Sequence, residues 1–411
     1  MKKPLLIEKP QGVTDFLPDT AANKRQIERE IAKHFERWGY REIITPTFEY
    51  MDTFQLGIRG AEDRVFKFVD RSGRMLVLRP DMTAPIARVA ASLLKNSPLP
   101  IRLSYTASIF RQQELVAGRD TEFTQAGVEL IGDDSPDADA EMISLAVSAL
   151  KAIGLTGFRL ALGQIGFVQG ILEEYAVDGD VRERLQNALA DKDYVEFERV
   201  AGSELDKEAA SVLSQLPRLR GGADILQTAR QLTNSKRAHE ALRNLQQIWN
   251  VLEIQGVSEY VQIDLSLLLG LNYYTGAVFE GYAPLIGFPV CGGGRYNELV
   301  EKFGRKAPAT GFIIGIERVL EILEKQQAFK PIQRYLLCYR EKDRQSALPF
   351  AAFLRANGQF VSTFLLDEEV PLPQTDGSLT IELRDGTLHA DEPSLLRLYA
   401  QFQSGEGGGI A

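Results

Sequence analysis

The segment Glu122–Ile131 alternates between two kinds of side chain with a period of two, which predicts a β-strand with two chemically different faces. One face carries Thr124, Ala126, Val128 and Leu130, and the other carries Phe123, Gln125, Gly127, Glu129 and Ile131. A face that presents a glutamine, a glycine and a glutamate in succession is not typical of a packed core. Two interpretations stay open: the glycine leaves room in which the two polar side chains hold a small ligand, or the face is exposed to solvent.

The segments around this strand predict a domain that mixes strands and helices. Residues 18–39 predict a helix, because Pro18 stands at its start, Gly39 follows its end, and apolar residues recur at helical spacing. The apolar face consists of Ile27, Ile31, Phe35 and Trp38. Further predicted strands are 41–44, 65–69, 75–78, 103–111, 158–162, 261–269 and 273–282, and further predicted helices are 81–94, 139–154 and one after Gly311.

Two longer regions differ from this pattern. Residues 167–255 are rich in Arg, Lys, Glu and Leu and poor in β-branched runs, which indicates an inserted helical subdomain. Residues 335–411 follow a linker at 326–334 and predict a small α/β domain. The sequence therefore predicts two domains, 1–325 and 335–411, with the helical insertion inside the first.

Composition narrows the classes of function. The two cysteines, Cys291 and Cys338, and three widely separated histidines exclude a disulfide framework and a paired-histidine or four-thiolate metal site. We therefore expect neither a metal nor a cofactor. The formal charge of −9 argues against a broad polyphosphate-binding surface. The apolar runs are too short to span a bilayer and Met1–Pro10 lacks a signal-peptide core, so we expect a cytoplasmic protein without membrane contact.

Three short strings suggest binding chemistry, each with a structural alternative. In Arg79–Thr83, Asp81 and Thr83 stand where they can either cap the first amides of a helix or bind a ligand ammonium, and capping is the commoner use. The glycine-rich Cys291–Asn297 predicts a close backbone approach to a ligand or a tight strand-to-helix connection. Leu271–Tyr274 predicts a phenol over a flat ring or ordinary packing.

Taken together and in order, these strings resemble the class II aminoacyl-tRNA synthetases, and within them the histidyl group. The resemblance runs from Gly12–Pro18 to about Leu323. Gly39–Pro46 resembles motif 1, Phe110–Arg111 with Phe123–Glu129 resembles motif 2, and Gly311–Arg318 resembles motif 3. The two histidine-specific signatures are resembled by Leu269–Tyr274 and Gly293–Asn297. The resemblance implies an α+β fold with an antiparallel sheet flanked by helices, and motif 1 implies a homodimer.

The resemblance also implies a histidine site. The residues that match it are Asp81, Thr83, Arg111, Gln125, Glu129, Tyr273, Tyr274 and Tyr296. Asp81 and Thr83 match the residues that hold the ammonium group, although the synthetases have glutamate in place of Asp81. Arg111 and Gln125 match the contacts to the carboxylate side and the polar backbone of the ligand.

The imidazole contacts are matched by Glu129 and Tyr274, with the other two tyrosines beside them. Imidazole needs one hydrogen-bond donor and one acceptor across its two nitrogens, and a glutamate with a tyrosine hydroxyl can supply both. Arg111 and Arg318 match the arginines that hold ATP in the synthetases, which implies at most a vestigial ATP site.

Three departures from the synthetases bear on catalysis. The arginine that helps activate the substrate carboxylate is replaced by Leu269, and an isobutyl group cannot stabilise developing negative charge. The motif 2 glutamate is replaced by Gln113. Residues 335–411 contain 6 basic and 11 acidic side chains, a poor electrostatic surface for a tRNA anticodon stem. We therefore expect no catalytic residues and no tRNA charging.

A histidine pocket without activation chemistry resembles the regulatory subunits of short-form ATP phosphoribosyltransferase, which are paralogues of histidyl-tRNA synthetase. The resemblance implies a hetero-oligomer with a short catalytic subunit, activation of that subunit, and feedback inhibition by L-histidine in the first step of histidine biosynthesis. Histidine must then favour the less active state of the complex. Two alternatives stay open: a divergent but active histidyl-tRNA synthetase, and a paralogue recruited to another amino-acid or protein-modification reaction.

Overall fold

The computed structural model describes residues 7–57, 65–112, 120–270, 273–367, 373 and 377–404. It divides into two compact units, Met1–Phe329 and Lys330–Ala411, and each is described here by itself. Within the described residues, no helix is both long enough and apolar enough to cross a membrane.

Nine strands of the described chain form the central sheet of the first unit, in the order β1-β5-β6-β12-β11-β10-β7-β9-β8. Their bounds are β1 Arg41–Glu42, β5 Ile101–Phe110, β6 Glu122–Ile131, β7 Arg159–Gln164, β8 Arg220–Gly221, β9 Val261–Asp264, β10 Ala277–Tyr282, β11 Cys291–Arg295 and β12 Ala309–Gly315. Between β5 and β7 in this sheet order, every pair of neighbouring strands is antiparallel, as expected. In contrast, β1 is parallel to β5, and β7 is parallel to β9. The sheet is therefore mixed, and the prediction of an antiparallel sheet is wrong at these two pairs.

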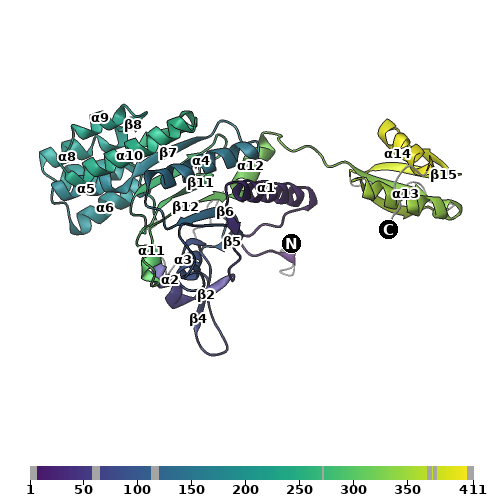
Figure 1. Cartoon of the computed structure of the whole chain (residues 1–411), viewed down its shortest axis with the longest axis horizontal. Helices are drawn as coiled ribbons and strands as arrows, with labels where there is room; N and C mark the ends of the chain where they lie inside the picture. The colour runs from purple at the N-terminus through teal and green to yellow at the C-terminus, as the bar shows by residue number, and fades with distance from the viewer. Residues whose placement is uncertain are drawn as a thin grey trace, which may run out of the picture. The chain divides into compact units, whose positions relative to one another are not determined.

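The helical insertion explains the second parallel pair. Parallel neighbours need a long crossover connection, and the chain between β7 and β9 supplies it. This connection contains α5 Ile165–Glu174, α6 Gly179–Ala190, α7 Tyr194–Glu204, α8 Lys207–Leu213, α9 Ile225–Arg230 and α10 Lys236–Ile254, with the short strand β8 between α8 and α9. Figure 1 shows these helices, in teal and green, gathered beyond the β7 side of the sheet.

Three helices pack against one face of the sheet (Figure 1). They are α1 Pro18–Arg37, α4 Pro136–Ala152 and α12 Ile316–Lys325. The predicted apolar face of α1 is confirmed, because Ile27, Ile31 and Phe35 are buried in the same core as Ala126, Val128 and Leu130 of β6. One of the two predicted faces of β6 therefore packs against helices, and the other is turned toward the site.

A smaller layer closes the other side of β5 and β6. The strands β2 Phe48–Tyr50, β3 Lys67–Val69 and β4 Met75–Leu78 form an antiparallel sheet, and the helices are α2 Met51–Gly57, α3 Thr83–Ala91 and α11 Leu299–Lys302. Val77, Met82 and Ile86 belong to a second buried cluster that also includes Tyr273 and Tyr296. The helix predicted at 81–94 is thus shorter at both ends.

The glycine-rich segment is a strand and not a connection. Cys291–Arg295 forms β11 between β10 and β12, although glycine-rich sequence is disfavoured in strand interiors. A Cβ on Gly293 would lie 2.1 Å from the carbonyl oxygen of Gly311, so only glycine fits this strand contact. For the same tertiary reason Gly311 lies inside β12, and the predicted helix begins only at Ile316.

Two predicted strands are shorter than expected. The strand predicted at 261–269 ends at Asp264, and the one predicted at 273–282 begins at Ala277. Sheet pairing sets these limits, since β9 pairs only with β7 and β8, and β10 with β7 and β11. Tyr273 and Tyr274 therefore precede β10, where their side chains are not bound to strand alternation.

The second unit has its own sheet and its own core. The sheet has the order β14-β13-β15-β16, with β13 parallel to both of its neighbours. The elements are β13 Arg334–Tyr339, α13 Arg344–Ala356, β14 Phe360–Leu365, β15 Leu379–Arg384, β16 Thr387–His389 and α14 Pro393–Ser404. Phe350 and Leu354 of α13 and Tyr399 of α14 are buried against β13 and β15.

Candidate ligand-binding site

The structure brings all eight residues of the expected histidine site around one cavity of about 380 Å³. The lining residues are Asp81, Thr83, Arg111, Gln125, Glu129, Tyr273, Tyr274, Gly292, Tyr296, Gly311, Phe312 and Ile313. We call this space the small cavity. Gly292, Gly311, Phe312 and Ile313 were not assigned to the site from the sequence, because only the pairing of β11 with β12 and of β12 with β6 carries them there.

Glu129 lines the small cavity and is 2% exposed. Its Oε1 accepts a hydrogen bond of 3.1 Å from the Thr83 hydroxyl, and its Oε2 accepts one from the Tyr296 hydroxyl. Burial is the largest influence and raises the pKa of Glu129 to about 8, while the two hydroxyl donors act in the opposite direction. The solvent-exposed alternative for this face of β6 is therefore wrong.

Gly311 makes room for the Glu129 carboxylate. The two residues are partners across the β6–β12 pair, and a Cβ on Gly311 would lie 1.9 Å from Glu129 Oε2 and 2.5 Å from the carbonyl oxygen of Val128. Since carboxylate and backbone both occupy the place of a side chain, this position admits no larger residue.

Gly127 does not leave room for a ligand, as one interpretation of the β6 pattern had it. Tyr105 of β5 is its cross-strand partner, and a Cβ on Gly127 would lie 2.5 Å from the Tyr105 hydroxyl oxygen. The glycine admits a buried tyrosine from the neighbouring strand. The small cavity is lined instead by Gln125 and Glu129, the neighbours of Gly127 on the same face.

Asp81 has one of its two predicted uses in the structure, the contact to the start of α3, and the binding of a ligand ammonium stays a prediction. Its Oδ1 accepts a 3.2 Å hydrogen bond from the amide of Ala84 and so caps the start of α3. Its Oδ2 is buried and has no hydrogen-bond partner within the part of the chain that the structure describes. Burial raises the pKa of Asp81, and the charge of Arg111 opposes this effect. A buried carboxylate oxygen without a partner is costly, so this atom is suited to a ligand N–H.

Arg111 and Gln125 lie where the small cavity opens. Arg111 Nε donates a 2.7 Å hydrogen bond to the carbonyl oxygen of Pro80, which orients the guanidinium next to the Asp81 segment. Gln125 Oε1 is buried and lacks a hydrogen-bond partner among the described residues. The opening thus holds a fixed positive group and an unsatisfied acceptor.

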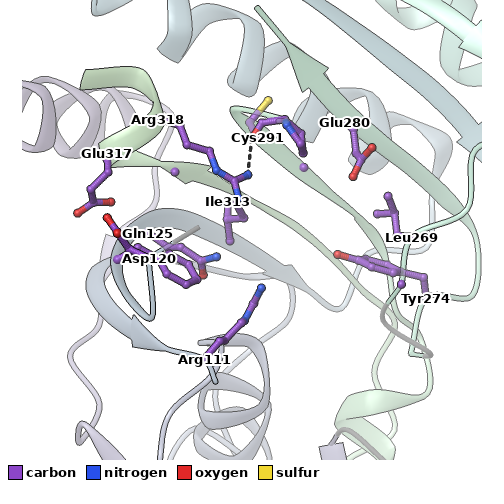
Figure 2. A pocket seen from close by; sticks show the side chains of 15 residues that line it. Arg111, Asp120, Gln125, Leu269, Tyr274, Glu280, Cys291, Ile313, Glu317 and Arg318 are labelled. Carbon is purple, nitrogen blue, oxygen red and sulfur yellow. Dashed lines mark hydrogen bonds between the residues drawn. The ribbon is translucent and has the colours of Figure 1, made fainter. Parts of the chain in front are cut away.

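A larger cavity of about 1000 Å³ adjoins the small one and shares Arg111, Gln125, Tyr274, Gly292 and Ile313 with it. Figure 2 shows Arg111 and Arg318 reaching into it from opposite sides, with Leu269 beside Tyr274. Arg318 donates a 2.6 Å hydrogen bond to the carbonyl oxygen of Pro289, the dashed line in Figure 2. The two arginines expected at an ATP site therefore line one space, and so does Leu269. Gln113, Leu271 and Asn272 lie outside the described residues.

Not all of the acidic residues near the start of α4 are exposed to solvent. Arg295 Nε lies 3.0 Å from both carboxylate oxygens of Asp139, and the two side chains are almost fully buried. Arg295 Nη1 also donates 3.0 Å to Asp134 and 2.9 Å to the carbonyl oxygen of Asp133. This network fixes the end of β11, where Tyr296 enters the site. Over the described residues, no group of three or more His, Cys, Asp or Glu could hold a metal ion.

Known proteins resemble the chain over most of its length. A family model described as histidyl-tRNA synthetase matches residues 12–319. The ATP phosphoribosyltransferase regulatory subunit of Moorella thermoacetica is 43% identical over 363 residues, which cover 88% of this chain and 93% of the relative. The chain belongs to the ATP phosphoribosyltransferase regulatory subunit family. The regulatory subunit of Desulforamulus reducens is 41% identical over 359 residues, covering 87% of this chain and 89% of that protein.

Solved structures agree with this family and with the fold. A crystal structure titled as an ATP phosphoribosyltransferase regulatory subunit/histidyl-tRNA synthetase from Bacillus halodurans has a TM-score of 0.83 and 37% identity, covering 93% of this chain and all of that one. Histidyl-tRNA synthetase from Nostoc has a TM-score of 0.74 and 22% identity over 89% of this chain and 87% of that one, which shows the fold alone. The class II synthetase-like fold expected from the sequence is confirmed.

Proposed function

We propose that this chain is a non-catalytic regulatory subunit that binds L-histidine in the small cavity and transmits its presence to a short catalytic ATP phosphoribosyltransferase subunit. The observation that carries the proposal is the set of oxygens around the small cavity. Asp81 Oδ2 and Gln125 Oε1 are buried acceptors without partners among the described residues, and the buried Glu129 carboxyl lines the same cavity. An amino acid with a ring that bears N–H groups would satisfy them.

The assignment of groups to this ligand follows from charge. Asp81 is placed to pair with the α-ammonium, Arg111 with the α-carboxylate, and Glu129 with the ring. Tyr274 and Tyr296 offer hydroxyls on the walls of the same cavity, so both ring nitrogens can find a partner. A purely apolar side chain would place no polar group against the buried Glu129 carboxyl, which disfavours such an amino acid.

The absence of catalysis rests on Leu269. This side chain lies on the wall of the larger cavity beside Tyr274, where the resemblance expects an arginine (Figure 2). Amino-acid activation develops negative charge at the carboxylate and the phosphate, and an apolar side chain gives it no stabilisation. The family membership of the chain also supports a regulatory role.

The test is calorimetric titration of the full chain with L-histidine, together with an aminoacylation assay on the same preparation. We expect saturable binding and no charging of tRNA. Asp81→Asn should weaken binding about ten- to a hundredfold, because a hydrogen bond to a charged group contributes about 1.5–3 kcal/mol. Asparagine keeps Oδ1 as an acceptor for the Ala84 amide, so the thermal midpoint should change little.

A matched control is Glu321→Gln, which removes a half-exposed carboxylate on α12, outside both cavities. It should bind histidine as the unmodified chain does. The proposal is wrong if histidine binds neither to the chain alone nor to its complex with a short catalytic subunit.

Regulation of the partner is tested in the reconstituted complex. The chain should raise the rate at which a short catalytic subunit condenses ATP with phosphoribosyl pyrophosphate, and histidine should lower it again. Because coupling is reciprocal, the Asp81→Asn complex should stay active and require correspondingly more histidine for inhibition. The homodimer expected from Gly39–Pro46 stays a prediction, and light scattering of the chain alone checks it.

A divergent histidyl-tRNA synthetase is the second candidate, because Arg111 and Arg318 line the same cavity as the synthetase pattern requires. It predicts histidine-dependent exchange of pyrophosphate with ATP by the unmodified chain. We expect none. Leu269→Arg tests whether the arginine is the group that the natural sequence lacks. Pyrophosphate exchange that appears only in this variant would exclude the synthetase function for the natural sequence.

A further inference from the structure

We propose that Arg79 is a positioning residue of the small cavity, which holds Pro80 and Asp81 in place without touching the ligand itself. This inference rests on the proposed function and adds to it a residue outside the lining of the cavity. It is carried by the burial of Arg79, by its hydrogen bonds to two separate segments, and by its place in the chain next to Asp81.

The guanidinium of Arg79 is buried against backbone carbonyls. The residue is 7% exposed, and its Nε donates a 2.9 Å hydrogen bond to the carbonyl oxygen of Ser108 on β5. Its Nη1 donates to the carbonyl oxygens of Thr45 and Pro46, at 2.9 and 3.2 Å, in the connection between β1 and β2. A rigid, planar group with several N–H donors can bridge two segments in this way, and a single ammonium group cannot.

The backbone of Arg79 is fixed as well. Its amide donates a 3.0 Å hydrogen bond to the carbonyl oxygen of Thr47, and its carbonyl oxygen accepts one of 3.1 Å from the amide of Phe110. Together with the side-chain bonds, these contacts join the end of β4 to the segment before β2 and to the end of β5. Arg79 is therefore held from two sides at the point where the chain leaves β4 and enters the site.

The two residues that follow Arg79 carry polar groups of the site. The carbonyl oxygen of Pro80 accepts the 2.7 Å hydrogen bond from Arg111 Nε, and the next residue is Asp81. Arg111 also has an anchor of its own, because its amide donates a 2.8 Å hydrogen bond to the carbonyl oxygen of Thr121. Asp81 is therefore the group of the site that depends most on Arg79.

The position of Asp81 Oδ2 is set by the backbone around it. Asp81 Oδ1 is bonded to the amide of Ala84, while Oδ2 has no hydrogen-bond partner among the described residues. The backbone of Asp81 lies between Arg79 on one side and the start of α3 on the other. A binding group acts well only when its supports hold it in one orientation, so loss of the Arg79 contacts should displace Oδ2 from the α-ammonium of histidine and lower the affinity.

Arg305 offers a matched control with the same kind of contacts in another place. Its Nη1 donates hydrogen bonds of 3.1 and 2.8 Å to the carbonyl oxygens of Ala90 and Leu94, and its Nη2 donates one of 2.9 Å to that of Ser97. Arg305 is half-buried and lines neither cavity. A merely structural role for Arg79 predicts that Arg79→Lys and Arg305→Lys behave alike, with a lower thermal midpoint and an unchanged affinity for histidine.

The experiment is calorimetric titration of the full-length variants with L-histidine, at a temperature where circular dichroism shows each of them folded. Arg79→Lys should bind histidine about tenfold more weakly than the unmodified chain, the effect of weakening one hydrogen bond to a charged group. Arg305→Lys should keep the affinity within about twofold. Normal affinity of Arg79→Lys would overturn the inference and leave the proposed function intact, whereas an unmodified chain that binds no histidine, alone or in the complex, would overturn both.

A ligand without the ammonium group shows whether Arg79 acts through Asp81. Imidazolepropionate keeps the ring and the carboxylate of histidine and lacks the α-amino group. Arg79→Lys should weaken the binding of this analogue by less than about threefold, because the analogue has no group to pair with Asp81. Equal losses for histidine and the analogue would contradict the inference.

A double variant tests the same step from the side of the protein. If Arg79 acts through Asp81, the effects of the two substitutions on histidine affinity are not additive. Arg79→Lys should then cost less than about threefold in a chain that already carries Asp81→Asn. A further tenfold loss in that chain would show that Arg79 acts on the site by another route, contrary to the inference.

Hydrogen exchange in the unmodified chain provides a test that does not require a variant to fold. The amides of Arg79 and Phe110 belong to the contacts that hold the segment before Asp81. Saturating histidine should slow their exchange more than saturating imidazolepropionate does, because only histidine has an ammonium group to engage Asp81. Equal slowing by both ligands, or none by either, would contradict the inference.

Discussion

Removing the buried carboxyl of Glu129 should change how stability depends on pH in the ligand-free protein. In the folded chain this carboxyl keeps its proton up to about pH 8, whereas in the unfolded chain it loses the proton near its ordinary value of 4.5. Between these values the folded state binds more protons than the unfolded state. Stability therefore falls as the pH rises, by about 1.4 kcal/mol per unit for this group.

The magnitude follows from the two pKa values. Between pH 5.5 and 7.5, Glu129 should lower the free energy of unfolding by about 2.5 kcal/mol, and Glu129→Gln should abolish this contribution. The variant, measured against the unmodified chain, should thus become relatively more stable by that amount over these two units. Asp81 and Asp139 also have raised pKa values, but both proteins contain them and their contributions largely cancel.

The assay is urea unfolding followed by tryptophan fluorescence at pH 5.5, 6.5 and 7.5, without histidine. The chain has two tryptophans, Trp38 at the C-terminal cap of α1 and Trp249 on α10, so the signal reports the first unit alone. Glu321→Gln should show a difference that varies by less than about 0.5 kcal/mol over the same range. If the Glu129→Gln difference is equally flat, Glu129 is ionised in the folded protein and the reasoning fails.

Two further predictions concern packing around the site. Gly311→Ala should destabilise the first unit by several kcal/mol in thermal unfolding, because the added Cβ would overlap Glu129 Oε2 and the carbonyl oxygen of Val128. The control is Gly202→Ala, whose added Cβ would meet no atom within 4 Å, and it should leave stability unchanged or raise it slightly. Arg295→Lys should lower stability by about 3 kcal/mol or more, since lysine cannot reproduce the bonds to both Asp139 oxygens and the Asp133 carbonyl; an unchanged unfolding midpoint would contradict this.

Hydrophobic periodicity was sufficient to predict the buried face of a helix or strand that packs against a single apolar layer. The apolar face of α1 and the two faces of β6 follow from spacing alone, because a helix or strand buries the side that its side-chain period selects. The cluster of eight residues in the small cavity followed from resemblance to a family, and histidine as its ligand stays a prediction.

Spacing failed where a distant strand determines the local conformation. Gly293 lies in a central strand because the backbone of β12 approaches it within the space of a side chain, and nothing local in a glycine-rich string indicates that. The role of Gly127 was misjudged for the same reason, since Tyr105 from β5 fills the space above it. Asp139 is buried because Arg295, far along the chain, reaches it.

The sequence by itself determined which faces of α1 and β6 are apolar and which residues are available for the site. Those properties are local, because they depend on side-chain identity and on the repeat of a helix or strand. Only the tertiary structure decided which polar atoms keep unsatisfied bonds. Asp81 Oδ2 and Gln125 Oε1 are buried acceptors without a partner among the described residues, and burial raises the pKa of Glu129 to about 8, because strands and helices distant in sequence exclude water from all three.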